Sequence, residues 1–175
     1  MDEQECLAAL RAHRHEVMNA LQVVKGYLQL KRIDRAQRAL DRLSDRLADL
    51  SRLQGAVASE EADILWCAIA LGRVRIQRWP TGICRTVVQV RAVCALLQAL
   101  ESCAAACGFD EVRVSAGGED RGLLWLRIEP VNGPAGAPER QGELDWWHTV
   151  QQETAGLGVR WDPPEDGARV VRLYG

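Results

Sequence analysis

The spacing of apolar residues predicts two helices in the first third of the chain. Apolar side chains recur at three- and four-residue intervals from about Glu3 to Leu30, at Leu7, Leu10, Val17, Leu21, Val24 and Leu28. A second stripe follows at Leu40, Leu43, Leu47, Leu50 and Leu53. Between them, Asp34 and Gln37 have the spacing of a capping box, and Gly55 is placed to end the second helix. The short connection predicts an antiparallel hairpin.

The apolar stripe of the first helix is too wide for one neighbouring helix to cover. Two helices alone cannot enclose such a stripe, and the simplest partner is a second copy of the same hairpin. We therefore expect a homodimeric four-helix bundle. The second helix also carries many charges of both signs, for which the pattern predicts a solvated face: Arg35, Arg38, Asp41, Arg42, Asp45, Arg46, Asp49 and Arg52.

The remainder of the chain predicts an α/β sandwich with a mostly antiparallel sheet. Helices are expected from Ser59 towards Trp79-Pro80, at Val90–Cys107 and at Leu144–Thr154. Extended segments are expected at Gly82–Val88, Glu111–Ala116, Leu123–Glu129, Val159–Trp161 and Ala168–Tyr174, with a loop at Val131–Gly142. The predicted fold class is α+β, with one domain at residues 1–57 and another at 58–175.

Composition narrows the function classes. A net charge of -2 over 175 residues gives no electrostatic footprint for nucleic acid or an anionic membrane. The acidic N-terminus is unlike a signal peptide, and Ile64–Leu71 is too short to span a bilayer, so we expect a cytoplasmic protein. The six cysteines include no CxxC pair and no set of metal-ligand spacing, which favours reduced thiols and no bound metal.

One histidine on the first helix is a candidate nucleophile. His15 falls outside the apolar stripe, on a side that it shares with Arg11, Asn19, Gln22, Gly26 and Gln29. A neutral imidazole on a rigid helix is suited to attack phosphorus, because phosphoryl transfer depends mainly on positioning and charge stabilisation. Arg11 and Arg14 are placed to neutralise phosphoryl oxygens, and Glu16 to orient the ring or handle a proton.

Gly26 has two interpretations. A glycine inside a helix costs about 1 kcal/mol relative to alanine, so its presence calls for a reason. Either the missing side chain lets another protein approach His15 closely, or it allows close packing within the bundle. His13 and His148 are read as ordinary structural or surface histidines.

The residues around His15 resemble the helical box of the sporulation-initiation phosphotransferase B family and of related sensor kinases. The match covers Leu10, Arg11, Arg14, His15, Glu16, Asn19, Leu21, Gln22, Val23, Gly26, Leu28, Gln29 and Leu30. The resemblance implies that His15 carries the phosphoryl group. It extends more weakly over the rest of the chain, whose order of elements resembles the ATP-binding domain of histidine kinases.

The nucleotide-binding boxes of that kinase domain are degenerate in this sequence. In the Asn-box run at Leu96–Ala106, Gln98 replaces the first Asn and Ser102 the magnesium-binding Asn. Val131 stands where an Asp would accept a hydrogen bond from the adenine amino group. Without that acceptor, binding of adenine would lose about 1–3 kcal/mol. Only Gly142 remains of the phosphate-binding Gly-x-Gly turn, beside acids and Trp146-Trp147. We therefore expect a domain that keeps the fold of the kinase ATP-binding domain but has lost the ability to bind ATP.

The resemblance therefore implies a phosphotransferase that moves phosphate between response-regulator aspartates through His15, without ATP, in sporulation initiation. Its partners would be receiver domains and a second copy of itself, with no nucleic acid and no membrane. It would need no cofactor of its own, since the receiver supplies Mg²⁺. The alternatives are an ATP-dependent histidine kinase fragment and a non-catalytic dimeric adaptor that binds a response regulator.

Overall fold

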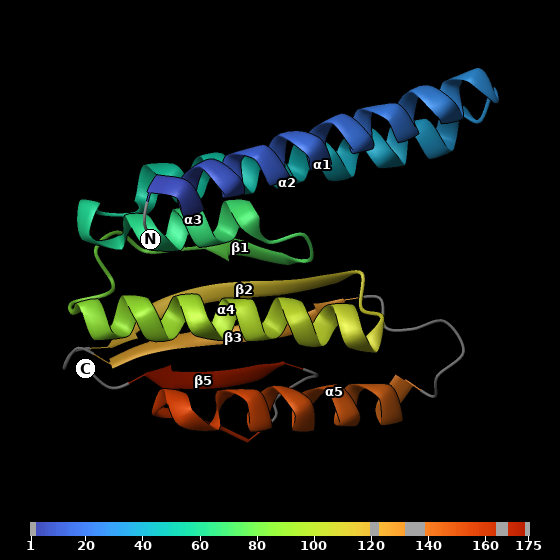
Figure 1. Cartoon of the computed structure of the whole chain (residues 1–175). Helices are drawn as coiled ribbons and strands as arrows, with labels where there is room; N and C mark the ends of the chain where they lie inside the picture. The colour runs from blue at the N-terminus through green and yellow to red at the C-terminus, as the bar shows by residue number, and fades with distance from the viewer. Residues whose placement is uncertain (1–2, 120–122, 132–138, 164–167, 174–175) are drawn as a thin grey trace.

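The N-terminal third of the chain forms the expected hairpin. The computed structural model describes residues 3–119, 123–131, 139–163 and 168–173, with the backbone alone at 119 and 139–145. Helix α1 (Glu3–Gln29) runs antiparallel to helix α2 (Ile33–Ala56), as Figure 1 shows in blue and teal. Lys31 makes the turn with a φ of 56°, and the Arg32 N–H donates to the Tyr27 carbonyl at 2.9 Å.

The ends of α2 differ from the prediction. Its N-cap is Arg32, which makes no side-chain capping bond, and Gln37 instead donates to Asp41 at 2.9 Å. The capping box is therefore wrong, because the left-handed Lys31 turn already closes the connection with backbone bonds. At the other end, α2 continues one residue past Gly55 to Ala56, and Val57 is extended.

The apolar stripes of the hairpin are only partly buried within one chain. Leu43 and Leu53 of α2 are buried. Six leucines of the two stripes remain 40–50% exposed: Leu7, Leu10, Leu21, Leu28, Leu40 and Leu47. The side of α1 that does pack in the chain carries small residues such as Ala9 and Ala20. A single hairpin thus leaves the predicted stripe largely uncovered.

The segment after the hairpin was partly mispredicted. A 3₁₀ turn (Ser59–Glu61) leads into α3 (Ala62–Ala70), and strand β1 (Val74–Arg78) follows. The predicted helix through to Trp79 is wrong because Val74 and Ile76 are buried while Arg75 and Gln77 are more exposed, the alternation of a strand. Helix α4 (Val87–Cys107) begins where an extended segment was expected, and Thr86 caps it by accepting from Gln89 N–H at 3.2 Å.

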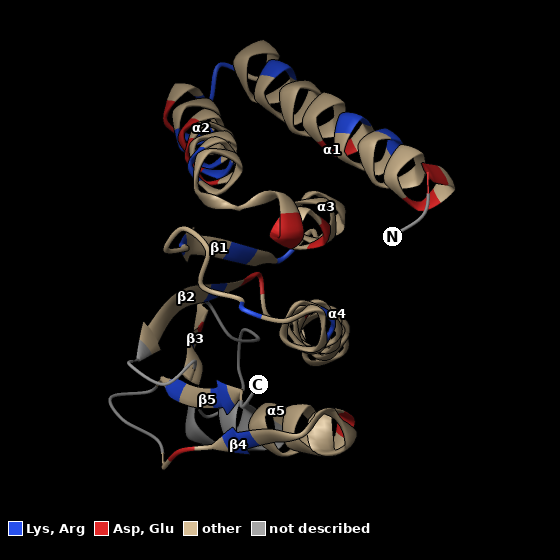
Figure 2. Ribbon diagram, turned by 90° about the vertical axis from the view of Figure 1, so that its left-hand side faces the viewer, with Lys and Arg blue, Asp and Glu red and all other residues tan. Residues whose placement is uncertain are grey.

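The chain after α3 forms a five-stranded mixed sheet with helices on one face. The strand order is β1-β2-β3-β5-β4, with β2 at Glu111–Glu119, β3 at Leu123–Val131, β4 at Val159–Trp161 and β5 at Arg169–Leu173. Among the strands that the structure describes, only β1 and β2 pair in parallel. Helices α3, α4 and α5 (Glu139–Thr154) lie on the same side of the sheet (Figure 2). The expected α+β class, mostly antiparallel, is confirmed; we call α3 to β5 the sheet module.

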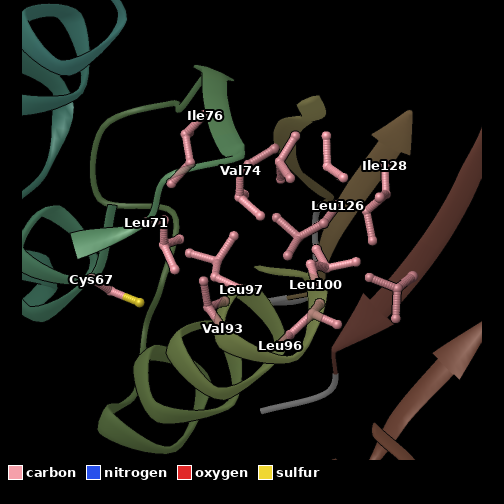
Figure 3. Packing of buried hydrophobic residues seen from close by; sticks show 14 of the residues in the cluster. Cys67, Leu71, Val74, Ile76, Val93, Leu96, Leu97, Leu100, Leu126 and Ile128 are labelled. Carbon is pink, nitrogen blue, oxygen red and sulfur yellow. The ribbon is translucent and has the colours of Figure 1, made fainter. Parts of the chain in front are cut away.

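The core lies between α4 and the sheet. Val93, Leu96, Leu97 and Leu100 of α4 point towards Leu126 and other buried residues of the strands (Figure 3). By length and composition alone α4 is long and apolar enough to cross a membrane, yet its apolar side packs here. The hairpin sits on the β1 edge of this layer, with α1 against α3 and α2 against β1, and its tip projects beyond the module (Figure 1).

Candidate functional site

His15 lies near the middle of α1 with its side chain exposed. Arg11 lies one turn before it and Asn19 one turn after it, and both are exposed. Arg14 and Gln22 are exposed as well. The structure therefore presents the predicted polar residues around His15 to solvent rather than to the sheet module.

Gly26 completes this face one turn beyond Gln22. It is half-buried, and a methyl group built on it would meet no atom of this chain within 4 Å. Close packing inside a single chain therefore does not explain the glycine. The space beside it is open to a second hairpin or to another protein.

Glu16 points away from His15, about 100° further round the helix. Its carboxylate accepts a hydrogen bond from Arg46 of α2, and the two form an ion pair. Burial raises the pKa of Glu16, which outweighs the opposing charge and hydrogen bond of Arg46, and Glu101 raises it further. The structure thus brings Glu16 to the contact between α1 and α2, next to the sheet module.

Arg46 connects three parts of the chain. Besides Glu16, its guanidinium donates to the Gly72 carbonyl at 2.7 Å and to the Leu71 carbonyl, both in the turn between α3 and β1. Only 15% of the Arg46 side chain is exposed. The prediction of a solvated arginine here is wrong, because it counted only the helix period and ignored the carbonyls that a neighbouring turn presents. Sequence spacing carries no signal for such a contact.

Asp49, one turn after Arg46, is buried as well. It accepts from Arg75 of β1 at 2.8 Å, while Arg52 pairs with its other oxygen. Arg75 also donates to Glu111 of β2 at 3.1 Å. For Glu111, burial favours the neutral carboxyl, but Arg113 and Arg75 together outweigh it and lower its pKa. The predicted solvated face of α2 is thus an ionic contact with the sheet edge at this end.

A groove of about 240 Å³ separates the hairpin from the sheet edge just beyond these contacts. Its hairpin side includes Val17, Ala20 and Val23, which follow Glu16 along α1, and Arg42 of α2. The opposite wall consists of residues at the starts of β1 and β2: Gly72, Arg73, Arg75, Asp110 and Glu111. Glu16 and Arg46 line this groove as well, so the residue next to His15 also belongs to the boundary between the two parts.

His13 differs from its neighbour His15. It is half-buried, and its Nδ1 is enclosed without a hydrogen-bond partner in the described part of the chain. Burial, together with the positive charge of Arg46, lowers the pKa of His13 below its ordinary value of 6.5. Both effects favour the neutral form of the His13 imidazole.

The helix that resembles the Asn-box helix of kinases has its own arrangement. Gln98 and Ser102 of α4 are exposed. Glu101 accepts hydrogen bonds from the backbone N–H groups of Arg73 and Val74, at 2.8 and 3.0 Å. Val131, the residue at the position of the adenine-binding Asp, is half-buried at the end of β3. Residues 132–138 of the other boxes lie outside the described residues, and Gly142 lies in α5, where the backbone alone is described.

The tryptophans that follow the last degenerate box belong to an aromatic core. Trp146 is fully buried, with its ring centroid 5.2 Å from Phe109 and 4.3 Å from Trp147. Trp147 in turn lies 5.9 Å from Trp161 of β4. Packing therefore fills this side of α5 with aromatic rings.

Nothing in the described part of the chain gathers a metal site. No group of three or more His, Cys, Asp or Glu residues there is arranged to hold a metal ion. The six cysteines are reduced, and Cys67, Cys84 and Cys103 are buried. Burial raises the pKa of the Cys84 thiol to about 12, so this group stays protonated.

Comparison with known families identifies the hairpin. Residues 1–54 match the family described as the alpha-helical domain of sensor kinases of the SpoOB type. The match confirms the resemblance to the sporulation-initiation phosphotransferase B family that the residues around His15 indicate. It relates the chain to sporulation and two-component signalling, and covers 54 of 175 residues. No curated protein is similar enough to the chain to count as a relative.

Proposed function

We propose that this protein is a phosphorelay phosphotransferase in which His15 receives a phosphoryl group from one receiver domain and passes it to another. The observation that carries the proposal is an exposed histidine, flanked by exposed Arg11 and Arg14, on a helix within the SpoOB-type match. Its partners are response-regulator receivers, and its setting is the cytoplasm.

The transfer is a pair of displacements at phosphorus. An unprotonated ring nitrogen of His15 forms a P–N bond as the P–O bond of the aspartyl phosphate breaks and the carboxylate leaves. The second receiver's aspartate reverses the step, forming a P–O bond and releasing imidazole. Arg11 and Arg14 neutralise phosphoryl oxygens, Asn19 and Gln22 offer hydrogen bonds to the docked receiver, and Gly26 leaves it room. The receiver supplies the Mg²⁺.

The protein works as a dimer in this proposal. The exposed Leu10, Leu21 and Leu28 of α1 lie about 120–140° round the helix from His15, so a second hairpin can cover them without covering His15. The result is a four-helix bundle that displays two histidines. The domains divide at residues 57 and 58, which separates the hairpin from the sheet module.

The sheet module serves as a scaffold rather than as an ATPase. Its order of elements supports descent from a kinase ATP-binding domain. Ser102 replaces the magnesium ligand of that domain, and Glu101 beside it is engaged with the backbone of β1. A kinase that charges His15 from ATP would need both a metal ligand and an adenine acceptor that this sequence lacks.

The test is phosphate transfer to the full-length protein without ATP. Receiver domains from several response regulators are phosphorylated with acetyl phosphate, freed of the donor and mixed with the protein. We expect acid-labile label on His15, located by mass spectrometry, and its passage to a second receiver. The label should vanish in His15→Gln and persist in His13→Gln.

Two other results would replace the proposal. Labelling of His15 by ATP in the absence of any receiver would make the protein a kinase. Stable receiver binding with no label on His15 from any receiver would make it an adaptor.

A further inference from the structure

We propose that Arg46 and Glu101 are positioning residues for His15, which hold its helix against the sheet module through the turn at residues 71–74. Neither residue touches the phosphoryl group. The inference rests on the proposed function, in which His15 accepts phosphate. It assigns a role to Arg46, which the sequence placed on a solvated face, and to Glu101, which the sequence left unassigned.

The first half of the connection joins α1 to the turn. Glu16 follows His15 directly in α1, and Arg46 binds its carboxylate. The same guanidinium donates to the Leu71 and Gly72 carbonyls. Because the planar guanidinium directs its N–H groups at fixed angles, these bonds together hold α1 at one distance from the turn.

The second half joins the turn to α4. The Glu101 carboxylate accepts from two successive N–H groups, those of Arg73 and Val74. Its other oxygen lies so near Gly72 that a methyl group on that residue would come within 3.2 Å. The turn at residues 71–74 therefore has its carbonyls bound from the hairpin side and its N–H groups bound from the module side.

The location of the connection explains why it matters for transfer. Beyond Glu16, residues Val17, Ala20 and Val23 of α1 line the open groove. The Arg46 contact is thus made beside the groove, one residue from His15. Phosphoryl transfer needs the attacking nitrogen in line with the bond that breaks, and a misplacement of about 1 Å can cost on the order of a hundredfold.

The expected effect falls on the rate of transfer rather than on receiver binding. Arg46 is largely covered and Glu101 is half-buried, so a receiver docked on His15 does not depend on touching them. We expect Arg46→Gln to lower kcat on the order of tenfold or more while KM for the receiver stays within about twofold. Glu101→Gln, which weakens both charge-assisted bonds, should lower kcat by a smaller factor.

The experiment measures kcat and KM for transfer from one phosphorylated receiver, in the full-length protein. Arg38→Gln is the matched control, since Arg38 is an exposed arginine two turns earlier on α2. Arg46→Lys keeps the charge and should recover part of kcat. The double variant Glu16→Gln/Arg46→Gln should lower kcat by less than the product of the two single-variant factors, because both substitutions break the same connection.

A purely structural role would give a different result. If Arg46→Gln lowered the melting temperature while kcat per folded molecule matched the wild type, the inference would be overturned. A rise in KM alone would overturn it too, because that result would make Arg46 a docking residue.

Amide hydrogen exchange separates this inference from the proposed function. Arg46→Gln should speed exchange in the turn at residues 71–74 and also in α1 around His15. Faster exchange confined to the turn would contradict the proposed link between the turn and α1, whether or not phosphate is transferred. The converse result is that Arg46→Gln speeds exchange in both segments while wild-type His15 takes up no label from any receiver. That result would support the connection through Arg46 and contradict the proposed phosphotransferase function.

Discussion

Asp49 of α2 and Arg75 of β1 form a buried ion pair between the hairpin and the sheet module. Their side chains are 5% and 13% exposed, and Arg75 Nε donates to Asp49 at 2.8 Å. Arg75 is bound from its other side by Glu111. Burial opposes the charge on Arg75, but its contacts with Asp49 and Glu111 outweigh this and raise its pKa. This enclosed charge pair therefore joins α2 to the first strand of the sheet module, in addition to the Arg46 contacts.

Removing one member of this pair should be costly. Asp49→Ala leaves the Arg75 guanidinium enclosed with less than its full set of acceptors, and we expect a loss of about 3–5 kcal/mol in the free energy of unfolding. Asp45→Ala, at an exposed position one turn earlier, should change it by about 0.5 kcal/mol or less. Urea unfolding of both variants decides the point, and equal stabilities would show that the buried pair contributes little.

Gly26 allows stability and function to be separated. Its added methyl group meets nothing within this chain, so Gly26→Ala should raise the free energy of unfolding by about 0.5–1 kcal/mol through helix propensity. The same methyl group would obstruct a partner that approaches closely, and transfer should therefore slow. Gly55→Ala, also open and distant from His15 in sequence, should stabilise without slowing transfer. A Gly26→Ala variant that transfers phosphate at the wild-type rate would contradict the close approach of a partner to Gly26.

The hairpin, the later strands and the face of His15 could be predicted because each follows from local periodicity. Strand β1 was missed although Val74 to Gln77 alternate apolar and polar residues, because the strand is short and follows closely on the apolar run of α3. The burial of Arg46 and Asp49 could not be predicted from the sequence either. On a helical wheel they share the charged side of α2, and what covers them is a turn and a strand that come 25 residues or more later.

The enclosed His13 should make stability depend on pH. Its folded-state pKa lies below the ordinary value of 6.5, so between these two values the unfolded chain binds more protons than the folded one. The free energy of unfolding should therefore fall as the pH drops below about 6.5, by at most about 1.4 kcal/mol per pH unit from this group. His13→Gln should lose this contribution in urea titrations between about pH 5 and 7.5. If the free energy of unfolding varied with pH in the same way for the variant and the wild type, the contribution from His13 would be contradicted.

The dimer is the last prediction, and it concerns the uncovered leucines of the hairpin. Leu10 and Leu21 of α1 are each 44% exposed, and Leu47 of α2 is 41% exposed. Burying such side chains yields about 1.5–3 kcal/mol each when burial is complete, so a second hairpin that covers them gains substantially. Leu21→Glu places a charge in that contact and should give a monomer in sedimentation velocity.

The fold should survive this substitution, because Leu21 is half open to solvent within one chain and its loss leaves no cavity in the core. Circular dichroism should therefore match the wild type. Leu30→Glu is the control: Leu30 is 68% exposed and lies on the His15 side of the hairpin tip, so its dimer should persist. If receivers dock against both hairpins, the Leu21→Glu monomer loses most of its transfer. A wild-type protein that sediments as a monomer with full transfer would contradict the four-helix bundle and its role together.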